Sequence, residues 1–511
     1  MADEDDIETG NPRDKLRQQS AHYLVLPDLV THFAEYATGA FARVIAELNN
    51  MYPGGLGKAK EKALEELKKA NVDADRITRA AASKSKLNLF VALTRDELMT
   101  LDRLRRETKS THFPIYKVWA DPKLRPFAGK PLRTIKADAC LATFGSHGRD
   151  IVVAVADSGI DGDHEHFKKF ANLEKLPDGL EHCDFTDDAA EDGASALVDE
   201  YGHGTHVAGI IAGCFSAKKE GAVTVLREQH VVDEEAPGDE GGTITVPRDN
   251  TEPVELRGVA PEAKLLSLKV LDGDGSGHAS NLIAALEHVF DLNDSGRKTK
   301  VHCLNLSLGY PFEAEWYAAG QSPLCVAVTR LVRSGVVVVA AAGNDGSIKM
   351  QFGGSTREKR IGLAQSINDP GNAEAAITVG STHGESPHLY GVSYFSSRGP
   401  TADGRMKPDL LAPGERILSC TPRAVAERIL AKNNVDGWNR ASACYREDTG
   451  TSMAAPHVAG AVAAFLSVQN EFIGRPDEVK RVFMSTCTDL GRTREFQGAG
   501  LIDMMRAIQS V

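Results

Sequence analysis

This 511-residue sequence contains eight cysteines but no pair at Cys-x-x-C spacing. Without such a pair there is no cysteine motif for a zinc site, and the scattered thiols favour reduced, buried side chains. An even number of cysteines also permits disulfides. No apolar run approaches the roughly 20 residues that a membrane-spanning helix needs. We therefore expect no membrane association.

The sequence also lacks an excess of positive charge, since 59 Lys and Arg stand against 71 Asp and Glu, a net charge of −12. This balance argues against a nucleic-acid or anionic-lipid partner and leaves polypeptides as the expected partners. The first eight residues are acidic and lack the basic start and apolar stretch of a secretory signal. We expect a cytoplasmic protein with more than one domain.

Apolar strand-like runs alternate with helical stretches through most of the chain. Runs at 151–157, 265–270, 301–308 and 336–342 are largely apolar and strand-like, whereas 279–292 has a helical pattern. Such alternation is typical of βαβ units. The sequence predicts an α/β fold, with a parallel central sheet flanked by helices and a smaller N-terminal α+β module.

One segment, 450–460, has the sequence GTSMAAPHVAG and sets Ser452 between a glycine turn and a small-residue helix. Small neighbours allow a substrate to approach, and a helix N-terminus stabilises a developing anion. We expect this helix, 452–469, to be buried on nearly every face. Pro456 is expected in its first turn, where a missing N–H costs little. Ser452 is the candidate nucleophile.

A serine nucleophile needs a base and a group that orients the base. Asp157 closes the apolar run 151–156, and His203 lies between two glycines at the start of a predicted helix. Taken alone, Asp157 is compatible with a simple turn cap. His203 and His206 also have the spacing of a metal pair, but no His-Glu-x-x-His motif accompanies them. His206 and His457 are interpreted as packing residues.

The chain order Asp157, His203, Ser452 and the sequences around these residues resemble the subtilisin-like (subtilase) serine peptidases. The resemblance runs from about Arg149 onward. It implies that Asn344, after the strand 336–342, donates to the oxyanion. It also implies two extended edges between which a substrate peptide lies as an added strand. These edges are Gly275, Ser276 and Gly277 on one side and Ser307, Leu308 and Gly309 on the other.

Tyr310 and the segment 215–256 depart from the family pattern, and Asp345 bears on substrate preference. Tyr310 occupies a position where relatives commonly keep glycine, which leaves the pocket preference open. Asp345 has two interpretations. Its carboxylate either favours a basic substrate side chain in the pocket or is a solvated turn residue. The calcium loop common among relatives is not recognisable in 215–256, so the sequence requires no cofactor, and Ca²⁺ rests on the resemblance alone.

Two regions precede the motifs that carry the resemblance. Residues 1–20 are expected to be an acidic disordered tail, and 21–127 a separate α+β module. By resemblance the module is a propeptide that chaperones folding and inhibits the site, cleaved between Pro122 and Lys136. A partner-binding or structural domain is the alternative. The catalytic domain, 128–511, carries an inserted loop at 215–256, and a long connection at 421–448 precedes Ser452.

The sequence thus predicts a serine endopeptidase that uses an Asp-His-Ser triad and an acyl-enzyme. Two alternatives remain. An amine can capture the same acyl-enzyme, which would give a peptide ligase or cyclase. Residues 21–127 can also occlude the cleft, which would give a latent regulatory protein.

Overall fold

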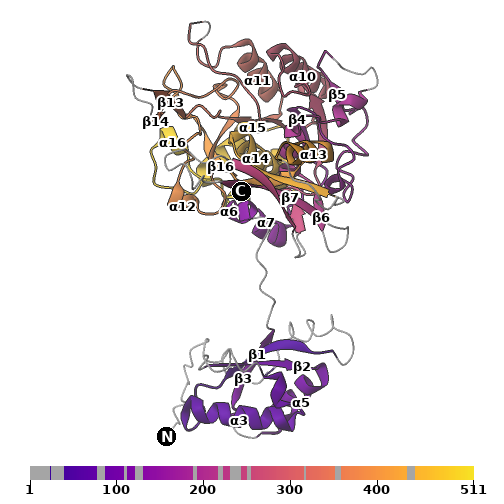
Figure 1. Ribbon diagram of the computed structural model, residues 1–511, viewed down its shortest axis with the longest axis vertical. Coiled ribbons are helices and arrows are strands. Elements are labelled where there is room, and N and C mark those ends of the chain that lie inside the picture. The colour runs from indigo at the N-terminus through magenta and orange to yellow at the C-terminus, as the bar shows by residue number, and fades with distance from the viewer. Residues whose placement is uncertain are drawn as a thin grey trace, which may run out of the picture. The chain divides into compact units, whose positions relative to one another are not determined.

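A computed structural model of the protein shows two compact units, residues 1–126 and 127–511, each described here by itself (Figure 1). The described residues are 24, 40–77, 87–108, 112–120, 130–187, 193–216, 223–230, 243–249, 255–315, 318–351, 358–433 and 443–511. The predicted tail at 1–20 lies outside them. So does the part of the predicted cleavage segment at 122–129.

Within its described residues, the N-terminal unit is a three-stranded antiparallel sheet with two helices packed against it. Its elements are β1 (Ala42–Leu48), α3 (Gly55–Lys69), a 3₁₀ turn (Ala74–Arg76), β2 (Asn88–Leu93), α5 (Arg95–Glu107) and β3 (Ile115–Ala120), with the strand order β2-β1-β3. A capping box starts α5, because Thr94 Oγ1 accepts from the Glu97 N–H and Glu97 accepts from the Thr94 N–H. Alternate strand residues such as Val44 and Val91 are buried together with Leu67 and Leu101. The unit therefore has its own apolar core.

The second unit is built on a seven-stranded sheet in which every neighbouring pair is parallel. The strands are β4 (Val152–Asp157), β5 (Cys183–Asp184), β10 (Lys264–Lys269), β11 (Cys303–Leu306), β12 (Val337–Ala341), β15 (Ile377–His383) and β16 (Leu410–Glu415), in the order β16-β15-β12-β11-β4-β10-β5. The predicted α/β class with a parallel central sheet is confirmed.

Helices cover both faces of this sheet, so its strands are apolar on both sides. The helices are α6 (Lys130–Thr134), α7 (Ala137–Phe144), α8 (His203–Ile211), α10 (Ala279–Leu292), α11 (Pro323–Arg333), α12 (Pro387–Tyr390), α14 (Thr451–Leu466), α15 (Pro476–Thr486), α16 (Arg494–Gln497) and α17 (Met504–Gln509). Figure 1 shows α10 and α11 on one side of β4 and α14 on the other. Val152 and Ala154 pack toward α10 and α11, whereas Val153 and Val155 pack toward α8 and α14.

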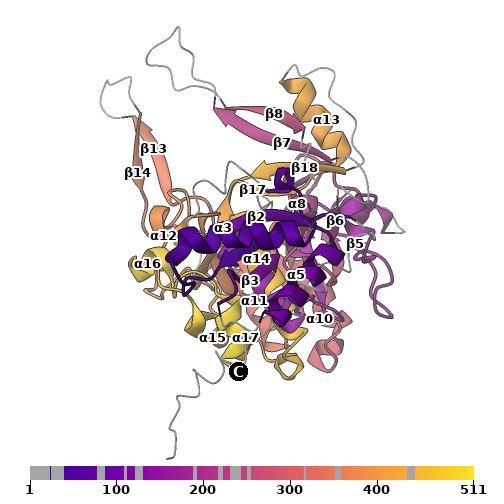
Figure 2. The same ribbon diagram turned by 90° about the horizontal axis from the view of Figure 1, so that it is seen from below.

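A second, accessory sheet has the order β17-β18-β7-β8 and lies next to α13 (Arg423–Lys432) (Figure 2). Its strands are β7 (Val223–His230), β8 (Thr243–Asp249), β17 (Ile417–Cys420) and β18 (Ala443–Asp448). β7 and β8 form an antiparallel hairpin, and β7 pairs in parallel with β18. The prediction of a loop at 215–256 is therefore wrong. Its apolar residues form strands because the distant connection at 421–448 supplies a partner.

Short strands complete the second unit. β6 (Cys214–Ser216) pairs with β9 (Glu255–Arg257) at the base of the β7–β8 hairpin, and β13 (Ser347–Gln351) pairs with β14 (Glu358–Gly362). Four 3₁₀ turns lie at Glu165–Phe167, Ala194–Leu197, Asp294–Gly296 and Asn470–Phe472.

The eight cysteines are all free thiols, which confirms the predicted reduced state. Seven of them are buried, and Cys183 is half-buried. Burial raises the pKa of Cys140, Cys325 and Cys487 to about 12. Such thiols are neutral packing residues with little thiolate character.

Candidate active site

Three neighbouring strands of the central sheet deliver candidate residues to one edge. Asp157 is the last residue of β4, Ser307 directly follows β11, and Asn344 lies three residues after β12. β4, β11 and β12 are adjacent and parallel, so their carboxyl ends lie at the same edge of the sheet. Sites of open α/β sheets form at this edge.

α8 brings His203 to Asp157. His203 is the first residue of the helix, and its Nδ1–H donates to Asp157 Oδ1 over 2.7 Å. The approach requires glycine at 204, because a Cβ there would lie 2.1 Å from the Gly159 carbonyl oxygen. Asp157 is 1% exposed and the His203 side chain 17% exposed. The buried carboxylate fixes the tautomer of the ring and leaves Nε2 as the acceptor.

Asp199 holds this arrangement from behind. Its Oδ1 accepts from the Gly202 N–H and from Ser158 Oγ, and its Oδ2 accepts from the N–H and the hydroxyl of Thr205. One buried carboxylate therefore ties the start of α8 to the residue after Asp157. The sequence analysis missed Asp199. An acidic residue four positions before a helix-opening histidine is the only signal there.

The local electrostatics raise the proton affinity of His203. Burial alone lowers the pKa of this imidazole, but the charge and hydrogen bond of Asp157, with a further contribution from Asp448, outweigh burial. The pKa of His203 is consequently raised above its ordinary value of 6.5. A base whose pKa lies above 6.5 accepts a proton readily near neutral pH.

Ser452 is the second residue of α14, which packs against α8. Its Oγ donates to the Ser307 carbonyl over 2.8 Å, and Ser307 Oγ donates to the Ser452 carbonyl, also over 2.8 Å. Pro456 explains the second bond. It lies inside α14 rather than in its first turn, which corrects the prediction. Its missing N–H would have bonded to the Ser452 carbonyl, and Ser307 satisfies that carbonyl instead.

Asn344 is held by the residue that precedes Ser452. Its Oδ1 accepts from the Thr451 N–H at 2.9 Å and from the Thr451 hydroxyl at 3.0 Å. With Oδ1 occupied, the Nδ2 amide is the available donor. A Cβ at Gly450 would lie 3.3 Å from this nitrogen, so glycine keeps the space beside it open.

The first predicted substrate edge is an exposed turn. The Asp272 N–H donates to the Ser276 carbonyl over 2.7 Å, and Asp274 Oδ1 accepts from the N–H and hydroxyl of Ser276. Gly275 has φ +84°, which favours glycine. Gly277 follows the turn and is exposed. These residues lie beyond β10, the other neighbour of β4.

The second predicted edge, 307–309, follows β11. Ser307 is buried, whereas Leu308 is half-buried. Tyr310 exchanges two backbone hydrogen bonds with Asp369, at 2.9 and 3.0 Å. Glycine is required at 309, because a Cβ there would lie 2.4 Å from the Asp369 carbonyl.

Asp345 lies on the surface next to Asn344. Its Oδ2 accepts from the Asn368 side-chain amide over 2.8 Å, and its N–H donates to Ser397 Oγ. These bonds fix the carboxylate locally, as in a turn.

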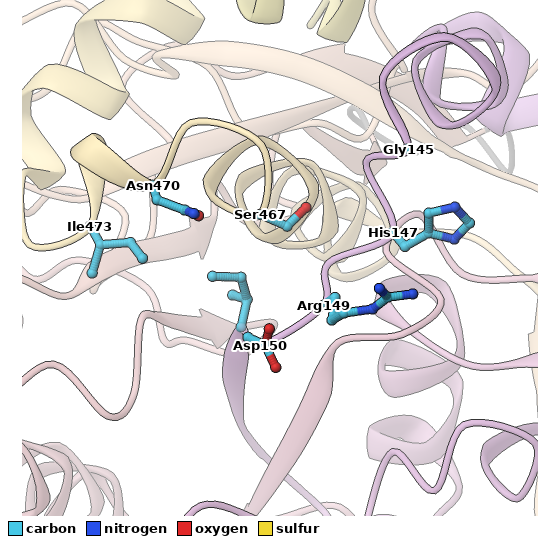
Figure 3. Close-up of a pocket in the computed structure, with 8 residues that line it drawn as sticks. Gly145, His147, Arg149, Asp150, Ser467, Asn470 and Ile473 are labelled. Carbon is cyan, nitrogen blue, oxygen red and sulfur yellow. The ribbon is translucent and has the colours of Figure 1, made fainter.

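A cavity of about 590 Å³ lies at the amino edge of the sheet (Figure 3). His147, Arg149 and Asp150 line it from the segment before β4, and Ser467 and Asn470 line it from the segment after α14. Fifteen residues of chain, roughly 22 Å of helix, separate Ser467 from Ser452. This cavity therefore belongs to the opposite end of the fold from Asp157 and His203.

No group of three or more His, Cys, Asp or Glu side chains in the described ranges is arranged to hold a metal ion. His206, the second member of the potential metal pair, is buried, and its Nε2–H lies 3.1 Å from both the Ile417 and Arg446 carbonyls. His457 Nδ1 contacts the Met453 carbonyl over 2.8 Å. Among the helices of the described residues, none combines the length and apolarity needed to cross a bilayer.

Comparison with known proteins agrees with this geometry. The profile of the Subtilase family matches residues 148–501. Serine protease AprX of Bacillus subtilis (strain 168) is 30% identical over 399 residues, covering 74% of this chain and 73% of its own. The major intracellular serine protease of the same organism is 31% identical over 355 residues, covering 69% and 79%. Subtilisin of Bacillus pumilus is 30% identical over 375 residues, covering 73% and 96%.

Proposed function

The chain belongs to the subtilase family and is a serine endopeptidase, and from this premise we propose that Asp157, His203 and Ser452 form its catalytic triad. The observation that carries the proposal is the 2.7 Å hydrogen bond between His203 and Asp157 at the carboxyl edge of the sheet. The packing of α14, which carries Ser452, against α8 supports it.

In the proposed reaction the substrate peptide displaces Ser452 Oγ from the Ser307 carbonyl. Ser452 Oγ then attacks the peptide carbonyl carbon while His203 Nε2 accepts its proton. Asp157 holds the ring and stabilises the imidazolium. The imidazolium next protonates the leaving amine, and water repeats the sequence on the acyl-enzyme, with His203 again as the base.

The oxyanion of each tetrahedral intermediate needs donors that are already in place. We assign this role to Asn344 Nδ2 and the Ser452 N–H. The two bonds from Thr451 to Asn344 Oδ1 support the assignment, because they orient the amide nitrogen without using it. No step requires a metal ion, so dialysis against EDTA should leave peptide hydrolysis unchanged. A loss that Ca²⁺ restores would contradict this expectation.

Intact mass after treatment with a fluorophosphonate probe tests the triad. The wild-type protein should gain one adduct, and the Ser452→Ala variant none. An equal adduct on both proteins would place the reactive group elsewhere.

We further propose that the N-terminal unit is a propeptide that inhibits the site until it is removed. The unit has its own apolar core, and the boundary between the two compact units lies near residue 126. Both observations support this proposal. The wild-type protein should shorten by cleavage between Pro122 and Lys136, whereas Ser452→Ala should keep its full mass. A fully active enzyme of unchanged mass would show that the unit is neither cleaved nor inhibitory.

We propose a cytoplasmic location. Eight free thiols suit a reducing compartment, and one relative is named an intracellular protease. Recovery of the protein in the cytosolic fraction of the producing cell tests this, and recovery in the medium would refute it.

A further inference from the structure

A charged pair from the accessory sheet lies against the start of α8. Arg446 and Asp448 are two residues apart in β18 and therefore project from the same face of the strand. The guanidinium Nη2 of Arg446 lies 3.1 Å from Asp448 Oδ2 and 3.4 Å from the carbonyl oxygen of Gly202. Gly202 directly precedes His203. The pair is thus attached to the backbone that presents His203.

A second contact fixes the strand to the same helix. His206 Nε2–H lies 3.1 Å from the Arg446 carbonyl oxygen. β18 is therefore bonded to α8 at residues 202 and 206, about one helical turn apart. Beyond the pair, the Asp448 Oδ1 atom accepts from the Thr449 N–H over 2.8 Å. Hydrogen bonds therefore hold both charged groups, because Arg446 donates to the Gly202 carbonyl and Asp448 accepts from the Thr449 N–H.

Charged side chains approach His203 from two strands. Asp157 at the end of β4 bonds to Nδ1, and Arg446 and Asp448 come from β18. His206, one turn along α8, is buried and has its pKa lowered chiefly by burial, so it is neutral. Asp199 bonds to the Gly202 N–H, and the Tyr201 ring centroid lies 6.4 Å from that of His203. Asp448 favours the imidazolium, and Arg446 opposes it.

We propose that Arg446 and Asp448 are positioning residues for His203: Asp448 stabilises the imidazolium that forms in the reaction, and Arg446 anchors Asp448 and moderates its charge. The inference rests on the proposed triad and adds a second carboxylate to it. Asp448 differs from Asp157 in exposure. Its side chain is 34% exposed, against 1% for Asp157, so solvent reduces its influence without removing it.

Three variants of the full chain test this pair: Asp448→Asn, Arg446→Gln and the double variant. The measurement is the pH profile of kcat/KM on a short uncharged peptide substrate. Asp448→Asn should lower the apparent pKa by about 0.5–1 unit, and Arg446→Gln should raise it by a similar amount. The double variant should fall between them. KM should stay constant, because neither residue is assigned a substrate contact.

The neighbouring residue provides a matched control. Glu447 lies between the two charges in sequence, but alternation along the strand directs its side chain to the other face. There its Oε1 atom lies 3.3 Å from Arg227 of β7. Glu447→Gln removes the same charge as Asp448→Asn and should leave the apparent pKa unchanged.

A readout independent of activity separates this inference from the proposed triad. Titration of His203 followed by NMR, with the resonance assigned by its loss in His203→Gln, should show the same opposite shifts. If Ser452 takes no fluorophosphonate adduct while the shifts appear, the triad fails and the charge pair stands. Unchanged titration in both single variants, or shifts of the same sign, would overturn the inference. So would an effect confined to KM, which would make Asp448 a substrate-contacting residue.

Discussion

The central sheet and the accessory sheet are held together in different ways. In the central sheet, α10 connects β10 to β11 and α11 connects β11 to β12, and the strand residues of β4 are buried on both faces. In the accessory sheet, β7 pairs with β18 across more than 200 residues of sequence. Side-chain bonds to α8 and to the segment 164–166 hold β18 in place. One sheet is the central scaffold, and the other packs on its core through residues such as Val225 and Tyr445 and is bonded to it by these side chains.

This difference separates two kinds of residue at the site. The elements of the packed scaffold present Asp157, His203, Asn344 and Ser452. The accessory sheet presents Arg446 and Asp448, whose charges act on the His203 imidazole. We therefore expect substitutions of the residues on the central scaffold to abolish turnover. Substitutions of Arg446 and Asp448 should change only the pH dependence of turnover.

The largest expected effect is that of Ser452→Ala. Loss of a serine nucleophile whose triad acts as a unit typically costs about 10⁶-fold in kcat. Steady-state hydrolysis of a peptide substrate measures it. Ser307→Ala is the matched control, because it keeps Ser452 and removes the hydroxyl that donates to the Ser452 carbonyl and accepts from the Asn305 side-chain amide. It should lower the free energy of unfolding by about 1–3 kcal/mol. Near-normal turnover by Ser452→Ala would refute the mechanism.

Next in size is Asn344→Ala, for which we expect a loss of about 10²–10³-fold in kcat with little change in KM. The reason is that the amide would contact the oxyanion and not the ground-state peptide. Asn368→Ala removes a nearby amide that bonds only to Asp345, and it should retain kcat. Equal losses in the two variants would indicate a general disturbance of this loop.

Acid should weaken the attachment of β18. His164 Nε2–H donates to the Cys444 carbonyl, and the His166 ring contacts the Tyr445 hydroxyl. Burial lowers the pKa of His166 to about 3 and also lowers that of His164. Below about pH 6.5 the unfolded chain binds protons that the folded one does not. The contribution of His166 to stability is therefore complete above pH 6.5 and falls toward pH 3, by about 1.4 kcal/mol per pH unit, and His164 acts in the same direction.

Urea unfolding between pH 7 and pH 4 measures this loss. His166→Gln keeps polar contacts at the ring position but cannot take up a proton, so its stability should fall less steeply with pH. Identical slopes for the variant and the wild-type protein would contradict the prediction.

The smallest expected effect concerns the ion pair between Arg227 of β7 and Glu447 of β18, whose atoms lie 3.3 Å apart. Both side chains are partly exposed, so Arg227→Gln should cost about 0.2–1 kcal/mol of unfolding free energy. It should leave kcat unchanged. A larger loss would mean that the β7–β8 hairpin supports the scaffold more than its contacts indicate.

Local sequence patterns account for the scaffold and for little of what is attached to it. The apolar run that ends at Asp157 and the helix that opens at His203 were recognisable, because strand ends and glycine-flanked helix starts have local signatures. The roles of these residues remain predictions. Asp199, Ser307 and the β7–β18 pairing were not recognisable in these roles, since each depends on a partner that only the folded chain brings near.

The register of β7 against β18 has a consequence for the order in which the protein forms. Every central strand from β10 to β16 lies between these two strands in sequence. Closing so long a loop before those strands have packed is entropically unfavourable, and such distant pairings form late. β18 leads through three residues to Ser452. Ser452 is therefore positioned only after the rest of the central sheet exists, so a chain that stops before β18 holds Asp157 and His203 without the proposed nucleophile.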